Sequence, residues 1–164
     1  MPGTNRAIAS LAVELDKDGL RVRYEFRDDD ATGVLTVEVR FGGFAGKSRA
    51  LFSDGDLLEF ADQLRTYPLG EQQFQVSGGY RTDDGVDEHV GMTVRAIGFR
   101  GLTGVSAHLA TPPDRVRYGT SVSEVRVEVL TSYEALGRFA SELTDLVSGK
   151  LEEAWLDADL VGAN

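Results

Sequence analysis

The chain has 164 residues, of which 17 are basic and 27 acidic, and its formal net charge at pH 7 is -10. This charge would repel nucleic acid and the anionic surface of a membrane, so we expect neither as a partner; a cationic partner is favoured. An acidic surface that only keeps the protein soluble is the alternative. The absence of cysteine excludes disulfides, thiolate catalysis and cysteine-based metal sites.

The N-terminal segment predicts two strands joined by a tight turn. Apolar and polar residues alternate over residues 11–15 and again over residues 20–26, and Lys17-Asp18-Gly19 between them is typical of a hairpin. The segment lacks the unbroken apolar stretch of a signal peptide, and no apolar run approaches the roughly 20 residues that cross a bilayer. We therefore expect a cytoplasmic protein without a membrane span.

An acidic loop, Asp28 to Asp30, leads into another alternating stretch, a Gly42-Gly43 turn and a strand over residues 44–52. The tripeptide Gly46-Lys47-Ser48 within that strand also ends the phosphate loop of nucleotide-hydrolysing enzymes. That loop begins with a glycine, where this chain has Phe41, and it runs from a strand into a helix. The tripeptide therefore indicates no nucleotide site, and we expect no cofactor.

Two segments, residues 53–70 and 131–147, predict amphipathic helices that each follow a strand. In both, a serine at the N-cap position precedes apolar residues spaced as on one helical face. The shared pattern is displaced by 79 residues: Ser53, Leu57, Phe60, Ala61 and Leu64 recur as Ser132, Leu136, Phe139, Ala140 and Leu143. Either the chain is an internal duplication, or two unrelated helices dock on similar sheets.

Four strands are expected before each helix, a ββββα pattern that occurs twice. Strands in series with a helix after each set predict an α+β fold, with a mainly antiparallel sheet of about eight strands and two helices on one face. We expect a single domain over residues 1–164, with repeat halves at about 7–70 and 71–148 and a C-terminal tail at 149–164. The tail shows helical spacing around Trp155, which predicts a short docking helix, or a contact surface if Trp155 is exposed.

The sequence contains no serine-hydrolase motif and no pair of acids that stands out as a catalytic dyad, so we expect no catalytic residue and no enzyme. The acidic residues instead gather in clusters. Repulsion among those of residues 83–88 has no local structural role, but it would complement a cationic partner. The predicted partner-binding residues are Asp83, Asp84, Asp87 and Glu88, joined by Asp28, Asp29 and Asp30 from another loop.

His89 and His108 lie on neighbouring predicted strands. If Ile97 pairs with Leu102 across the intervening turn, Gly91 faces His108, and His89 lies one diagonal step away on the same polar side. A metal or proton-transfer site is conceivable there, whereas exposed or hydrogen-bonded structural histidines are the alternative. We expect no metal, and the two histidines are the candidate ligands if one binds.

The run FAGKSRALFSDGDLLEFADQL, followed by QFQVSG, HVGMTVRAI and VRVEVLTSYEALGRFASEL, resembles the WapI-type immunity proteins of bacterial contact-dependent toxin systems. It is also similar to related actinobacterial domains of unknown function. The shared pattern covers roughly residues 8–147 and contains no catalytic residue. The resemblance implies a small acidic cytoplasmic protein that binds and neutralises a toxin partner, such as a nuclease. The alternative is a small-molecule-binding or enzymatic domain that uses the open face of the sheet.

Overall fold

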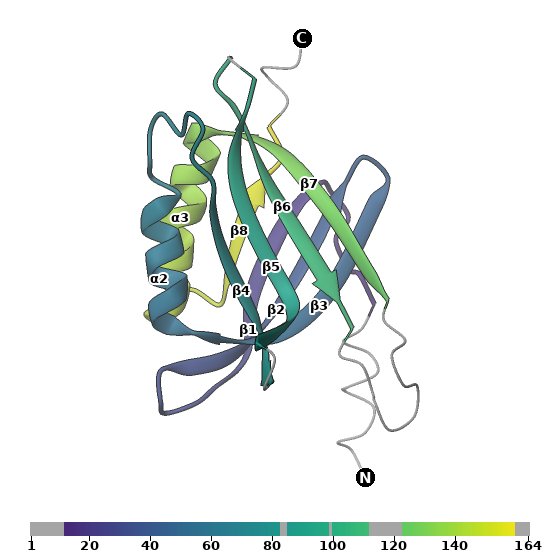
Figure 1. Cartoon of the computed structure of the whole chain (residues 1–164), viewed down its shortest axis with the longest axis vertical. Coiled ribbons are helices and arrows are strands. Elements are labelled where there is room, and N and C mark those ends of the chain that lie inside the picture. Colours follow the sequence, from purple (N-terminus) through teal and green to yellow (C-terminus); the bar gives the residue numbers. More distant parts are fainter. Residues whose placement is uncertain (1–11, 83–84, 99, 112–122, 160–164) are drawn as a thin grey trace.

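The computed structural model describes residues 12–82, 85–98, 100–111 and 123–159. The described residues form an α+β fold with antiparallel strand pairing, eight strands and two helices, as predicted (Figure 1). The eight strands form two sheets of four, with strand orders β3-β2-β1-β8 and β4-β5-β6-β7, which we call sheet A and sheet B. In chain order the elements are β1 (Gly19–Arg27), β2 (Thr32–Phe41), β3 (Phe44–Ser53), α2 (Asp54–Gln63), β4 (Phe74–Thr82), β5 (Gly85–Ile97), β6 (Leu102–Ala110), β7 (Glu124–Ser132), α3 (Tyr133–Val147) and β8 (Glu153–Asp157).

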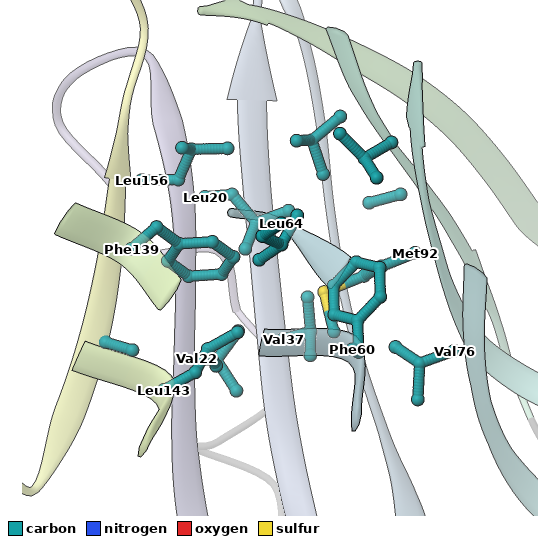
Figure 2. Packing of buried hydrophobic residues seen from close by; sticks show 14 of the residues in the cluster. Leu20, Val22, Val37, Phe60, Leu64, Val76, Met92, Phe139, Leu143 and Leu156 are labelled. Atoms are coloured by element: carbon teal, nitrogen blue, oxygen red, sulfur yellow. The ribbon is translucent and has the colours of Figure 1, made fainter. Parts of the chain in front are cut away.

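One apolar core lies between the two sheets and the helix pair. The helices pack side by side at the left of Figure 1, where α2 contacts β4 and α3 contacts β8. Buried side chains of both sheets and both helices belong to the same cluster, in which Val22 and Met92 come from opposite sheets and Phe60 and Phe139 from the two helices (Figure 2). Burial of this shared surface is the main force that holds the two sheets together.

The two helices begin in the same way. The side chain of Ser53 accepts a hydrogen bond from the backbone N–H of Asp56, and that of Ser132 accepts one from the N–H of Ala135. Each serine thereby satisfies a donor that the first helical turn leaves unpaired. The apolar residues that recur at a displacement of 79 are all buried, as a docked helical face requires: Leu57, Phe60, Ala61, Leu64, Leu136, Phe139, Ala140 and Leu143.

The cross-strand registers of the two sheets correspond. Val22 pairs with Val37 and Val37 with Ser48 in sheet A. In sheet B, Met92 pairs with Ala107 and Ala107 with Val127. Each helix is followed by a strand that crosses to the other sheet, since β4 after α2 pairs with β5 and β8 after α3 pairs with β1. The observed order is therefore three strands, a helix and a crossing strand, which occurs twice along the described residues.

The hairpin predicted at the N-terminus is wrong in the described part of that segment. Residues 12–18 contain no strand. They cross the outer face of sheet A, where the N–H of Glu14 donates to Glu38 and the side chains of Lys47 and Arg40 donate to the carbonyls of Ala12 and Leu15. The buried Glu38 attracts this segment, because a carboxylate removed from water needs hydrogen-bond donors.

The docking helix predicted for the C-terminal tail is also wrong, because the tail forms β8 at the edge of sheet A. Trp155 is half-buried in this strand, its indole N–H donates to Asp157 (2.6 Å), and Lys17 lies over its ring. The tail forms a strand and not a helix because Ala154 and Leu156, which are two residues apart, are both buried in the core. The indole is held within the fold, so the structure does not support Trp155 as a separate contact surface.

Candidate partner-binding surface

The predicted partner-binding residues fall into two groups on different sheets. Asp28, Asp29 and Asp30 are exposed in the turn between β1 and β2. Asp87 and Glu88 lie in β5 of sheet B, and Asp83 and Asp84 lie outside the described residues. No hydrogen bond or ion pair joins the two groups within the described part of the chain.

The carboxylate of Glu88 contacts side chains of both neighbouring strands of sheet B. It accepts a hydrogen bond from the hydroxyl of Ser77 (2.5 Å), and its Oε2 atom lies 2.7 Å from Nδ1 of His108. Glu88 reaches both partners across Gly91, where an added Cβ would lie only 2.5 Å from the carboxylate. A carboxylate held in this way is not a free contact for a partner, so of the two predicted groups the β1–β2 turn is the better candidate.

The predicted pairing of Gly91 with His108 is confirmed, but the predicted neighbour of His108 is wrong. A β-bulge between β4 and β5 pairs Gly78 with Val90 and Gly79 with Glu88, so that one extra residue, His89, is inserted. His89 is buried, and Glu88 takes the place beside His108. The described residues contain no group of three or more histidine or acidic side chains placed to hold a metal ion.

A second bulge creates a surface feature that sequence periodicity did not reveal. The alternation of residues along β1 predicts that Phe26 lies on the buried side of the sheet with Tyr24. The strand register shifts at Glu25, however, because Tyr24 pairs with Leu35 and Phe26 pairs with the adjacent residue of β2, Val34. The shift turns Phe26 onto the outer face, where it is 54% exposed. A β-bulge has no strong sequence signal of its own, so alternation alone gave the wrong face.

Phe26 belongs to an apolar row on the outer face of sheet A. Val34 pairs with Phe26 on one side and with Leu51 on the other, and Leu51 is itself 40% exposed. Side chains of directly paired residues lie close together on one face, so the three form a contiguous apolar strip across β1, β2 and β3. We call Phe26, Val34 and Leu51 the apolar row.

The surroundings of the apolar row are acidic. The turn that carries Asp28 to Asp30 directly follows β1, and none of these three carboxylates forms an ion pair within the described residues. Of the cations near this end of sheet A, Arg49 pairs with Glu25 (3.2 Å), and Arg27 donates to the carbonyls of Leu146 and Val147 at the end of α3. Arg23, which pairs with Thr36 across β1 and β2, is a further cation on this face. The three carboxylates of the turn therefore make the side of the apolar row next to the turn acidic.

The turn itself is ordered by the local chain. The N–H of Asp28 donates to the carbonyl of Thr32 (2.9 Å), and the hydroxyl of Thr32 donates to Asp30 (2.6 Å). Ala31 has a positive φ of 61° and its carbonyl accepts from the N–H of Asp54, which ties the turn to the start of α2. These bonds present the carboxylates on a defined loop, which favours recognition by a partner.

No helix among the described residues is long and apolar enough to span a membrane. Comparisons with family models, with curated proteins and with solved structures give no match to this chain.

Proposed function

We propose that this chain is a non-enzymatic binding protein of the immunity type. In the cytoplasm it binds and neutralises a cationic protein partner, such as a nuclease toxin. The observation that carries the proposal is the apolar row beside the β1–β2 turn, whose three exposed carboxylates form no ion pair within the described part of the chain. Apolar side chains gathered on a protein surface and rimmed by polar groups are a common feature of protein interfaces. An aromatic anchor such as Phe26 often supplies a large share of the binding energy.

The charge distribution suits a basic partner. The net charge of -10 attracts a cationic protein from a distance, and the turn of Asp28 to Asp30 offers it local carboxylates beside the apolar row. Such complementarity mainly raises the rate of association and selects the partner, while the buried apolar contacts slow dissociation. An immunity protein needs both properties, because it must reach its toxin quickly and remain bound.

The proposal is tested by affinity capture from the native cell, followed by binding of the purified partner. The apolar variant carries Phe26→Ser and Leu51→Ser, and the charge variant carries Asp28→Lys, Asp29→Lys and Asp30→Lys. A matched control reverses three carboxylates exposed elsewhere, Asp62→Lys, Glu71→Lys and Glu152→Lys. Each charge reversal at an exposed carboxylate should shift the free energy of unfolding by about 0.5 kcal/mol, or by about 1 kcal/mol at Asp30, which loses its hydrogen bond from Thr32. The half-exposed Phe26 and Leu51 should each cost about 1 kcal/mol.

Wild type and control are expected to capture the same cationic protein, and both test variants are expected to lose it. The captured protein, expressed alone in a host cell, should be toxic, and coexpression of the wild-type chain should restore growth. Capture of the same partner by wild type, the control and both test variants would show that this surface is not part of the interface. A captured partner whose toxicity is unaffected by the chain would contradict the immunity function.

A further inference from the structure

The outer face of sheet B contains an open recess of about 560 Å³ that the partner-binding surface does not use. Its floor is one cross-strand row in which Thr93 of β5 pairs with Gln75 on one side and with Ser106 on the other, and Ser106 pairs with Glu128. Arg126 lies on the same face, two residues before Glu128 along β7. We call Gln75, Thr93, Ser106 and Arg126 the recess residues.

One side of the recess is bounded by an ionic contact that crosses a glycine. Glu128 leans over Gly104, where an added Cβ would lie 3.0 Å from its carboxyl carbon, and accepts two hydrogen bonds of 2.8 Å from Arg95. Outside the recess lining, on the same face, Glu88 crosses Gly91 to His108, whose second ring nitrogen lies 2.9 Å from Glu124. The contact between Glu128 and Arg95 orders one wall of the recess in the absence of a ligand.

The polar groups of the recess residues are not engaged by other described residues. Within the described part of the chain, none of their side chains takes part in a hydrogen bond or an ion pair. They therefore offer a guanidinium, two hydroxyls and an amide on one face, held by four neighbouring strands. Polar groups that converge in this way are the kind that fix the orientation of a small ligand in a binding site.

The corresponding row of sheet A shows that the opening is not a general property of the fold. Thr36 of β2 occupies the place that Ser106 has in sheet B, by the shared register of the two sheets. The side chain of Glu25 covers it, accepting from the hydroxyl of Thr36 (2.7 Å) and from Arg49 (3.2 Å), and Thr36 is buried. In sheet A the carboxylate of Glu25 covers the row of Thr36, whereas the corresponding row of Ser106 in sheet B is open to solvent.

We propose that the recess binds a small monocarboxylate that carries hydroxyl groups. Arg126 takes the carboxylate in a paired arrangement of two N–H donors, and the hydroxyls of Thr93 and Ser106 with the amide of Gln75 bind the hydroxyl groups. A single negative charge is favoured, because Glu124 and Glu128 flank Arg126 on β7 and would repel a doubly charged phosphate. The proposal is independent of the partner-binding function.

The test is a titration of the ¹⁵N-labelled full chain with D-gluconate and with glycerate, followed by NMR. The neutral amides of the two acids, gluconamide and glyceramide, are the ligand controls. Arg126→Gln removes the proposed carboxylate contact, and Arg100→Gln changes an exposed arginine in the turn between β5 and β6 as a matched control. The backbone amides of Thr93, Ser106 and Arg126 report on the recess.

At least one acid is expected to shift these amide signals saturably with a millimolar dissociation constant, while its amide shifts them little. Arg126→Gln should weaken that binding about tenfold, because a charge-assisted contact is lost, and Arg100→Gln should leave it unchanged. Equal effects of acid and amide, equal binding by Arg126→Gln and wild type, or no saturable shift with either acid would each overturn the proposal.

Discussion

The Oε2 atom of Glu88 lies 2.7 Å from Nδ1 of His108, across the glycine that separates them on the outer face of sheet B. Burial by itself lowers the pKa of His108, but the contacts with Glu124 and Glu88 outweigh it and raise the pKa above its ordinary value near 6.5. The charge of Arg126 acts in the opposite direction. The protonated imidazole therefore holds β5, β6 and β7 together through two carboxylates.

This arrangement predicts a pH-dependent contribution to stability. Because the pKa of His108 is raised in the folded state, its contribution is complete below about pH 6.5 and is lost as the pH rises through the folded-state pKa. Urea unfolding of wild type and His108→Gln should thus give a larger stability difference at pH 6 than at pH 9. Equal differences at the two pH values would show that His108 is not stabilised in its charged form.

A second prediction concerns the equivalent leucines of the two helices. Leu64 and Leu143 are both buried in the shared core (Figure 2). Truncation of either to alanine removes apolar contacts and leaves a cavity, so each variant should lose about 2 to 5 kcal/mol of unfolding free energy. The surface variant Leu58→Ala on α2 is the control, since Leu58 is 42% exposed. A loss below about 1 kcal/mol at either core position would contradict its place in the core.

A third prediction concerns Glu38, which is 1% exposed on the outer face of sheet A. It accepts a hydrogen bond of 2.6 Å from Arg21, and its carboxylate lies 3.7 Å from Lys47. Glu38→Gln leaves these cations without their carboxylate, so it should cost about 3 to 5 kcal/mol in chemical denaturation at pH 7. Glu25→Gln breaks the more exposed pair with Arg49 and should cost no more than about 1 kcal/mol.

The stability due to Glu38 should also fall in acid. Burial raises the pKa of its carboxyl, but the hydrogen bonds from Arg21 and from the backbone of Glu14 outweigh this and lower it. A lowered folded-state pKa gives stability that is present above the unfolded value, near 4.3, and is lost as the pH falls through the folded value. The difference in unfolding free energy between wild type and Glu38→Gln should therefore shrink as the pH falls below about 4. A difference that stays constant with pH would show that Glu38 is not ionised in the folded protein.

Much of the fold could be predicted because its signals are local. Serine N-caps, helical spacing and the alternation along β2 to β7 depend on neighbouring residues, and they gave the element types there. The tail was misassigned because a segment as short as that around Trp155 fits both helical and strand periodicity, and only its pairing with β1 decides between them. The division into two sheets depends on long-range pairing that no local pattern contains.

The candidate site was predictable only in part. Asp28 to Asp30 were found from their charge, and the structure exposes them on an ordered turn. The apolar row was missed because Phe26 reaches the surface only through the bulge at Glu25. Glu88 was assigned to a partner because its contact with His108 depends on another bulge, which alternation does not reveal.

The β1–β2 turn and the apolar row are the proposed binding site for a cationic protein. The most direct measurement is the association rate with the purified partner as a function of salt, for wild type, the charge variant at Asp28 to Asp30 and the control reversed at Asp62, Glu71 and Glu152. The charge variant should associate more slowly than the control, with a flatter salt dependence, because it has lost local steering as well as net charge. Identical rates and salt slopes for the charge variant and the control would contradict the claim.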